Sequence, residues 1–250
     1  MKRWLTFLGL ICFCFVLVGW LQVVPIDEPV VTAGGCGTFV SGDLLNETFD
    51  STGYDNTWTE NINNGTVDED ENTTPGSSEC GFDGEWLEIE IPTGSYSRAH
   101  IYTDLSTSHS AIYVRFTFYL ESESLADGDS YYIFVPRTTS SVGDVSNAAI
   151  KLAKTSGNLE LQLWSRYASR DTYTISTGTT YCVEAYWDNS SNNWEWKIDG
   201  ISQGSGTNDP ETDFQRIKLG QYGDNATNIP IHYYIDHVDI SSTGWLGCDQ

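Results

Sequence analysis

Apolar and polar residues alternate along most of the chain after residue 85. Residues 113–120 are apolar at the even positions, and residues 159–164 place leucine at every odd position. This two-residue period is typical of strands that bury one face. The same pattern predicts further strands over 85–91, 131–137, 148–154, 181–187, 194–198, 214–220 and 232–240. No window shows a helical period, so the chain after the N-terminal segment is expected to be all-β.

Clusters of Gly, Asn, Asp and Ser separate these runs. Residues 127–129 and 188–193 have the composition of hairpin loops. About ten or more short antiparallel strands with polar turns predict a two-sheet antiparallel β-sandwich of the jelly-roll type. The stretch 56–78 lacks alternation and contains four consecutive acidic residues, so a long acidic surface loop is expected there.

The first 33 residues have the features of an export segment. Lys2 and Arg3 precede an apolar run over 4–24, and small residues lead up to Ala33. This order predicts a signal peptide. The run is about 20 residues long, which also suffices to span a bilayer, so an uncleaved N-terminal membrane anchor is the alternative. Both place a single domain, residues 34–250, outside the cell or at its surface.

The chain is strongly acidic. Lys and Arg total 12 against 35 Asp and Glu, which gives a formal net charge of −23 over 250 residues. This balance argues against nucleic acid as a partner, because its phosphates bind through basic side chains. It also disfavours an anionic membrane surface. Aromatic residues make up 13% of the chain and provide ample material for a folded core.

Four cysteines follow the export segment: Cys36, Cys80, Cys182 and Cys248. An even number in an oxidising compartment indicates two disulfides, with three pairings to choose from. Sandwich domains often place their first and last strands side by side, so we favour Cys36–Cys248, which leaves Cys80–Cys182. A zinc site is not expected, because no CxxC pair occurs.

Several motifs stand in an order shared with a known superfamily. They are Leu44–Asp50 with Trp58, Tyr113–Phe116, Tyr186–Asp188, Trp194–Gly200, Ile217–Gly220 and Tyr234–Gly247. Together they resemble the laminin G-like and concanavalin A-like lectin-glucanase superfamily over nearly all of 37–250. The resemblance implies a jelly roll. This architecture hosts lectins, binding modules, glycosidases, polysaccharide lyases and adhesive domains, so the resemblance alone does not assign an activity.

The strand around residue 162 carries the strongest candidate site. Its leucines are expected to face the core, which leaves Glu160, Gln162, Trp164 and Arg166 on the opposite face. A sugar ring stacks on an aromatic side chain while polar neighbours bind its hydroxyls, so this combination is suited to a glycan. The alternative is that Trp164 packs under a loop or in a subunit contact.

A second strand adds cations to this face. Arg216, Lys218 and Tyr222 are expected to point outward. If both strands lie in one curved sheet, these residues line a groove together with Arg115 and Tyr119.

The segment Lys218–Tyr222 resembles the Lys-x-Gly-x-Tyr strand of jelly-roll polysaccharide lyases. Those enzymes abstract the proton α to a uronate carboxylate and use tyrosine as acid or base, and His100 is the candidate histidine for such chemistry. The Gln-x-His and Arg-x-Glu-x-Arg motifs of those lyases are missing from this sequence.

One structural calcium ion is a further expectation. Extracellular jelly rolls often hold such an ion with carboxylates and carbonyls. Glu47 and Asp50 near the first strand and Asp236 near the last would lie close together if the ends of the domain pair. These three residues are the predicted ligands.

We therefore expect a secreted or cell-surface jelly roll that binds a glycan without catalysis. The predicted contacts are Gln162, Trp164, Arg166, Lys218 and Tyr222. The first alternative is a polysaccharide lyase acting on a uronate-containing glycan. The second is a structural or adhesive subunit whose exposed aromatic side chains contact neighbouring copies in an extracellular assembly.

Overall fold

Fifteen β-strands and no helix make up the part of the chain that the structure describes. The structure is a computed structural model. The described residues are 41–49, 54, 56–71, 86–93, 98–137, 148–165, 168–207, 213–221 and 229–248. All of them belong to residues 33–250, the larger of the two units into which the chain divides.

The predicted export segment, residues 1–33, lies outside the described residues. Within the described ranges, no helix is long and apolar enough to cross a membrane. The signal peptide and its alternative, the membrane anchor, therefore both stay predictions.

Eight strands form the first sheet, and all of its pairs are antiparallel. In spatial order, seven of them are β13 (Ile201–Thr207), β12 (Asn193–Ile198), β11 (Thr180–Asp188), β6 (Ala111–Glu123), β15 (Ile231–Ser241), β4 (Trp86–Ile91) and β3 (Thr66–Glu71). The eighth, β1 (Leu45–Glu47), pairs with β15. The first and last strands of the described fold thus lie side by side.

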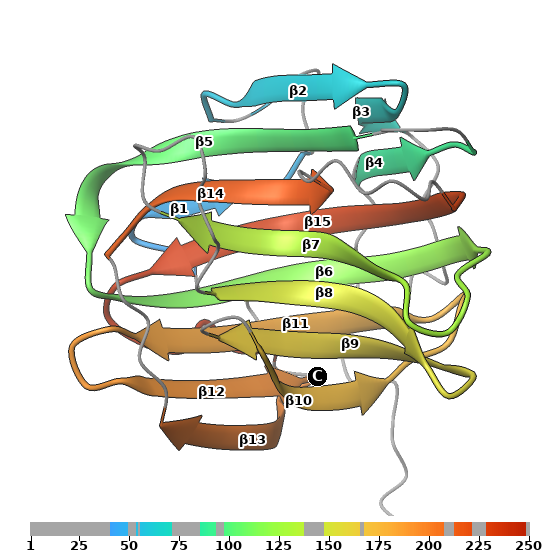
Figure 1. Cartoon of the computed structure of the whole chain (residues 1–250). Helices are drawn as coiled ribbons and strands as arrows, with labels where there is room; N and C mark the ends of the chain where they lie inside the picture. The colour runs from blue at the N-terminus through green and yellow to red at the C-terminus, as the bar shows by residue number, and fades with distance from the viewer. Residues whose placement is uncertain are drawn as a thin grey trace, which may run out of the picture. The chain divides into compact units, whose positions relative to one another are not determined.

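Seven strands form the second sheet, again with antiparallel pairs throughout. In spatial order they are β10 (Ala168–Thr174), β9 (Asn158–Ser165), β8 (Ala148–Thr155), β7 (Ser130–Arg137), β14 (Phe214–Gln221), β5 (Arg98–His109) and β2 (Thr59–Asn63). The strands of the two sheets run in nearly the same direction, as in an aligned β-sandwich (Figure 1). The predicted two-sheet antiparallel architecture is confirmed.

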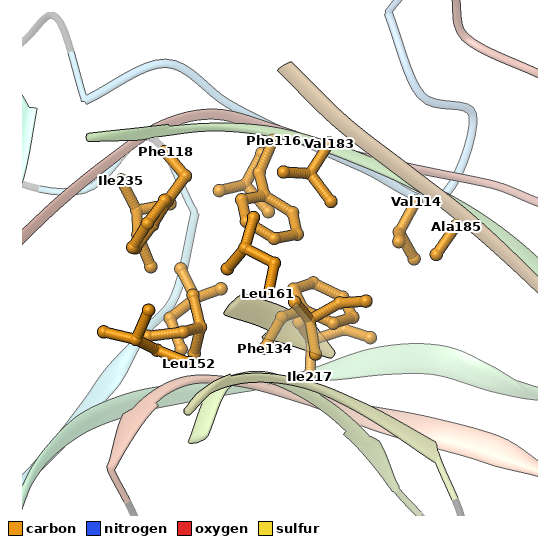
Figure 2. Packing of buried hydrophobic residues seen from close by; sticks show 14 of the residues in the cluster. Val114, Phe116, Phe118, Phe134, Leu152, Leu161, Val183, Ala185, Ile217 and Ile235 are labelled. Atoms are coloured by element: carbon orange, nitrogen blue, oxygen red, sulfur yellow. The ribbon is translucent and has the colours of Figure 1, made fainter. Parts of the chain in front are cut away.

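Side chains of the two sheets meet in one core between them. Figure 2 shows Phe116 and Val183 of the eight-stranded sheet pointing toward Leu161 and Phe134 of the seven-stranded sheet. The Phe134 ring is stacked parallel to Phe116, with centroids 5.5 Å apart, and parallel to Trp187, with centroids 6.4 Å apart. These inward positions determine, by alternation, which side chains of each strand point away from the core.

The strands expected from alternation are confirmed as β4, β6, β7, β8, β9, β11, β12, β14 and β15. Their facing is confirmed as well where a strand has one buried face. In β4, for example, Leu87, Ile89 and Ile91 are fully buried, whereas Glu88 and Glu90 point outward.

The expectation of a long surface loop over 56–78 is wrong for residues 59–71. These residues form β2, which pairs with β5, and β3, which pairs with β4 in the other sheet. A Cβ on Gly65, between the two strands, would lie only 2.9 Å from the Ala99 Cβ, so the chain crosses closely there. Strands at sheet edges keep exposed polar side chains, so backbone pairing forms them without apolar alternation. Residues 72–78 lie outside the described residues.

The expected disulfide pairings Cys36–Cys248 and Cys80–Cys182 are wrong. Cys182 is bonded to Cys248, with a Cα–Cα distance of 5.9 Å. Each expected bridge would require one of these two cysteines. Cys36 and Cys80 lie outside the described residues.

The path of the C-terminal segment explains this pairing. After β15 the chain passes over Arg115 of β6 and Glu184 of β11. The N–H of Gly247 donates to the Glu184 carboxylate at 2.8 Å, and the Arg115 guanidinium donates to the Gly247 carbonyl at 3.0 Å. These contacts hold Cys248 over Cys182 of β11. Pairing of the terminal strands was expected correctly, but it does not decide where the chain goes after them.

Candidate functional site

One face of the seven-stranded sheet carries most of the candidate residues. Ile150 and Leu152 enter the core from β8, so Lys151 between them points outward. Cross-strand neighbours in an antiparallel pair share a face, which extends this assignment from strand to strand. We call the following outward-pointing set the basic face: Arg98, His100, Tyr102, Tyr132, Arg137, Lys151, Gln162, Trp164, Arg216 and Lys218.

Trp164 and Lys151 form the first cluster of this face. The Lys151 ammonium lies 3.5 Å from the centroid of the Trp164 ring and 4.2 Å from that of Tyr132. The Trp164 Nε1–H donates to Gln162 Oε1 at 3.0 Å, and Gln162 Nε2–H donates to Glu160 at 3.2 Å. Lys151 is 7% exposed and Gln162 is 9% exposed. The cluster is therefore already ordered before any ligand arrives.

Tyr102 anchors a second cluster on β5 and β14. The Arg216 guanidinium carbon lies 4.4 Å from the centroid of the Tyr102 ring, and the Lys218 ammonium lies 5.9 Å from it. Arg216 also forms a two-point ion pair with Asp104, with N–O distances of 2.6 and 2.8 Å. This bond holds the pKa of Asp104 below its usual range. Lys218 and Arg216 are thereby positioned next to an aromatic ring, as Lys151 is.

Two small apolar residues connect the clusters. Val135 pairs with Lys218, and Ala149 pairs with Trp164, so both lie on the basic face. Neither is exposed. Three strand spacings separate β14 from β9, which is about 14 Å. Two fully buried apolar side chains thus lie between the two cation–aromatic clusters.

His100 lies beside the second cluster as a neutral ring. It is 2% exposed. Burial, together with the positive charges of Lys218, Arg98 and Arg137, lowers the pKa of His100 to about 4. Its Nδ1 lies 3.3 Å from the carbonyl oxygen of Gln221. Because a carbonyl only accepts, the proton sits on Nδ1 and the lone pair on Nε2.

Gly220 allows β14 to approach β5 next to His100. Its φ of +101° lies in the region that favours glycine. A Cβ there would be 2.4 Å from the Ala99 carbonyl oxygen and 3.0 Å from the His100 Cα. The fold therefore requires the glycine of the Lys-x-Gly-x-Tyr segment, independently of any chemistry.

The basic face contrasts with the rest of the molecule. Among the described residues, five lysines and arginines lie on it, although the formal net charge of the chain is −23. They are Arg98, Arg137, Lys151, Arg216 and Lys218. Two carboxylates, Asp104 and Glu160, share this face, so its described cations outnumber its anions by five to two. A local excess of one charge raises the local concentration of ligands of the opposite charge.

Three of the five predicted contact residues share this face: Gln162, Trp164 and Lys218. The condition that their two strands lie in one sheet is met. Arg166 and Tyr222 lie outside the described residues.

The expectation that Arg115 and Tyr119 join this face is wrong. Both belong to β6, which pairs with β11 and β15 in the other sheet. Arg115 is buried there against Asp239. Tyr119 packs near Tyr234 instead.

The predicted calcium ligands have other partners where the structure describes them. The buried Glu47 carboxylate accepts from Trp58 Nε1–H at 2.7 Å, and the buried Asp236 accepts from the His237 N–H at 2.6 Å. Asp50 lies outside the described residues. In the described ranges, no three His, Cys, Asp or Glu side chains form a group that could hold a metal ion. Structural calcium stays a prediction.

Sequence reasoning missed several members of the basic face. Tyr102 belongs to β5, which was not expected as a strand although Ala99, Ile101 and Leu105 are buried along it. That apolar spacing was the available signal. Lys151 lies on a strand that was expected, and its outward direction followed from the neighbouring apolar residues.

The chain was compared with known proteins. No family model and no curated protein sequence matches it. Among solved structures, the cellulose-induced protein Cip1 matches with a TM-score of 0.60 and 16% identity, covering 82% of this chain and 99% of that one. This match confirms the jelly-roll β-sandwich, and at such identity it shows the fold alone. The narrower laminin G-like assignment stays a prediction.

Two further solved structures match less well. A sialidase has a TM-score of 0.47 and 15% identity, covering 64% of this chain and 16% of that one. The marine PL7 alginate lyase AlyA1 from Zobellia galactanivorans has a TM-score of 0.45 and 13% identity, covering 74% of this chain and 94% of that one.

Proposed function

We propose that the basic face binds an acidic polysaccharide without cleaving it. Carboxylates of uronate units meet the cations, and the apolar faces of the sugar rings lie on the aromatic side chains. The observation that carries this proposal is the gathering of five cations on one face of a chain whose formal net charge is −23. Binding of a neutral sugar would not require such a group of cations.

The ordering of the cations supports binding. Lys151 is held against two rings, and Arg216 is held by Asp104 and Tyr102. A lysine or arginine that is already fixed loses less conformational entropy when an anionic ligand binds. Both clusters lie on the same face of one sheet, about 14 Å apart, so a chain of sugars could contact both.

Export is part of the proposal. Disulfides persist in oxidising compartments such as the cell exterior, and Cys182–Cys248 is one. A secreted or surface-bound protein would meet polysaccharides there. Self-association into an extracellular matrix, the structural alternative, stays a prediction that analytical ultracentrifugation of the purified protein checks.

A second candidate is β-elimination of the same class of polymer. It is favoured by the neutral His100, whose Nε2 lone pair could take the proton on C5 of a uronate unit. The C4–O bond then breaks, a C4=C5 double bond forms, and the leaving oxygen takes a proton. Lys218 would neutralise the carboxylate. The 2% exposure of His100 places it under other atoms, and for that reason we put binding first.

The test is calorimetric titration of the protein with polyguluronate, polymannuronate and polygalacturonate at low and high salt. We expect binding of at least one polymer that weakens with salt, because exposed charges are screened. Lys218→Ala should lower the affinity about tenfold. The matched control is Lys197→Ala, which removes a lysine from the other sheet, where it lies over Trp245.

Each outcome of this titration is informative. Equal loss in both variants would contradict the basic face as the site. Absence of binding to all three polymers would contradict the proposed ligand class. If ultraviolet absorbance rises because unsaturated product forms, and His100→Gln abolishes this rise, the function is elimination rather than binding.

A further inference from the structure

Four described strands lie at the ends of the two sheets, and they differ in charge. They are β3 and β13 in the eight-stranded sheet and β2 and β10 in the seven-stranded sheet. The outer backbone groups of an end strand can pair with another chain, so proteins protect such strands with charged residues, proline or bulges. The protection of each end strand therefore decides where another chain can extend a sheet.

Three of the four end strands carry charged residues. Four of the six residues of β3 are acidic, and β2 contains Glu60. β10 contains Arg170 and Asp171, and the Asp171 carboxylate accepts from Trp196 Nε1–H of the other sheet at 2.9 Å. Charges on an end strand, or turned inward from it, oppose pairing between sheet edges.

β13 carries no charge. Its seven residues, ISQGSGT, include no acidic or basic side chain and no proline, in a chain whose formal net charge is −23. Ile201 at its start is 68% exposed, more than any other large apolar residue that the structure describes. Among the described strands, β13 pairs with β12 alone and lies at the end of its sheet (Figure 1). It is thus the end strand that a second copy of this acidic chain can approach with the least repulsion.

One bulge divides β13. The register with β12 shifts at Gln203, which is left out of the pairing. From Gly204 to Thr207 the register is unbroken. This segment is therefore the part of β13 that can extend the sheet in a regular way.

The side chains of this segment are suited to pairing with themselves. Trp196 is buried in the core, so its partner Gly204 lies on the inner face of the sheet and Ser205 on the outer face. Residues directly opposite each other in an antiparallel pair share a face. In a twofold pairing of the segment with itself, Ser205 therefore lies opposite Ser205 or Thr207 of the second copy. On the inner face, glycine lies opposite glycine.

We infer that two copies of this protein pair through Gly204–Thr207 of β13, antiparallel and related by a twofold axis, so that their eight-stranded sheets become continuous. Such an interface is closed and stops at the dimer. One short strand pair buries little area, so we expect a weak association, with a dissociation constant on the order of 100 µM. Both copies are acidic, so salt should strengthen the dimer by screening their repulsion.

The dimer would present two basic faces on one side. The twofold axis is perpendicular to the shared sheet, so both seven-stranded sheets lie on the same side of it. A long polyuronate can then contact both basic faces, and its affinity rises by avidity. This consequence rests on the proposed function, whereas the pairing of β13 does not.

Sedimentation velocity of the purified protein from about 5 to about 500 µM tests the pairing without any ligand. We expect a dimer whose fraction rises with protein concentration and with salt. Ser205→Glu brings like charges close together across the interface and should raise the dissociation constant at least about tenfold. Thr59→Glu is the matched control, because Thr59 is exposed on β2, an end strand of the other sheet.

Amide hydrogen exchange locates the contact. The backbone amides of Gly204–Thr207 should exchange more slowly as the protein concentration rises, and those of β2 should not. A protein that stays monomeric up to about 500 µM at high salt would overturn the inference. So would a dimer that Ser205→Glu and Thr59→Glu weaken equally, or one whose exchange slows at β2 instead of β13. Neither measurement involves a polyuronate, so failure of this inference is distinguishable from failure of the proposed function.

Discussion

The ammonium of Lys151 lies 3.5 Å from the centroid of the Trp164 ring. The two residues stabilise each other: the ring covers the apolar stem of the lysine, and the ammonium is attracted to the electron-rich face of the ring. The pair therefore stays ordered outside the core. It also means that a change in either residue affects the shape of the site as well as its charge.

Lys151→Met should separate charge from packing. Methionine keeps much of the apolar stem, so we expect a folded protein whose affinity for the bound polyuronate falls about tenfold at low salt. The salt dependence should decrease too, because one cation fewer contacts the polymer. Lys154→Met is the matched control on the same strand, since Lys154 pairs with Glu123 at 3.1 Å. Calorimetry of both variants checks this; equal affinities would rule out Lys151 as a contact.

Trp164 should matter through its ring rather than its N–H. Trp164→Phe keeps a stacking surface and loses only the bond to Gln162, so we expect affinity within about threefold of the parent protein. Trp164→Ala should lose about tenfold or more. The same titration measures both variants. If the phenylalanine variant binds as poorly as the alanine variant, the indole N–H contributes instead.

His100 should make stability depend on pH. Its pKa is about 4 in the folded protein and near 6.5 in the unfolded chain, so the unfolded state binds the proton more readily. The contribution is present in full above about pH 6.5 and is lost as the pH falls toward 4, by on the order of 3 kcal/mol.

Urea unfolding between pH 7 and pH 4 measures this loss. His100→Gln removes the titration, so its free energy of unfolding should fall less steeply over that interval. The remaining histidines and carboxylates are common to both proteins and cancel in the comparison. Parallel curves would mean that His100 titrates normally in the folded state.

The two arginine–carboxylate pairs should differ in their importance for stability. Arg115 and Asp239 are each 1% exposed, and Asp239→Asn removes the carboxylate that the buried guanidinium contacts. We expect a loss of about 3 to 5 kcal/mol. Asp104→Asn breaks the pair with the more accessible Arg216 and should cost about 1 kcal/mol or less. Urea unfolding at pH 7 compares them, and similar losses would contradict this view of the Arg115 pair.

Opening the Cys182–Cys248 disulfide should destabilise the domain. The bond joins residues 66 positions apart, and a loop of that size corresponds to about 4 kcal/mol. Cys182→Ser, Cys248→Ser and the double variant should show the same loss, because each opens the same bond. Thermal unfolding under non-reducing conditions measures it. A larger loss in the double variant would indicate that the cysteines do not pair with each other.

Alternation revealed the strands that bury a full face, and it could not reveal those at the sheet edges. β13 is mostly exposed, and its sequence carries no apolar period. It forms because Asp199 and Gly200, both with positive φ, reverse the chain directly after β12. An Asp-Gly pair is a strong hairpin signal, so this strand was within reach of sequence reasoning.

The sequence predicts which face of β9 carries the candidate site. It does not predict the full set of residues that make up the site. Because Leu161 and Leu163 are buried, Gln162 and Trp164 had to share the outer face.

β8 and β9 form a hairpin through Ser156 and Gly157, so their pairing was within reach of sequence reasoning. β7 and β14 are far apart in the sequence, so the place of Lys218 beside Val135 could not be assigned. The disulfide pairing could not be predicted either, because it depends on the path of the segment after β15.

The positions of β14 and β15 have a consequence for how the chain acquires its structure. β15 lies between β6 and β4, and β14 lies between β7 and β5, so the last two strands of the described fold occupy interior places in their sheets. In a nascent chain that has emerged only as far as β13, each sheet has a gap where β14 or β15 belongs. The flanking strands β4, β5, β6 and β7 then each have one unpaired edge. Such edges are prone to join those of another molecule. Inserting β14 and β15 into these gaps requires contacts between distant parts of the sequence, and such contacts slow folding. Newly made chains would be most vulnerable to aggregation during that interval, which ends when β14 and β15 have paired.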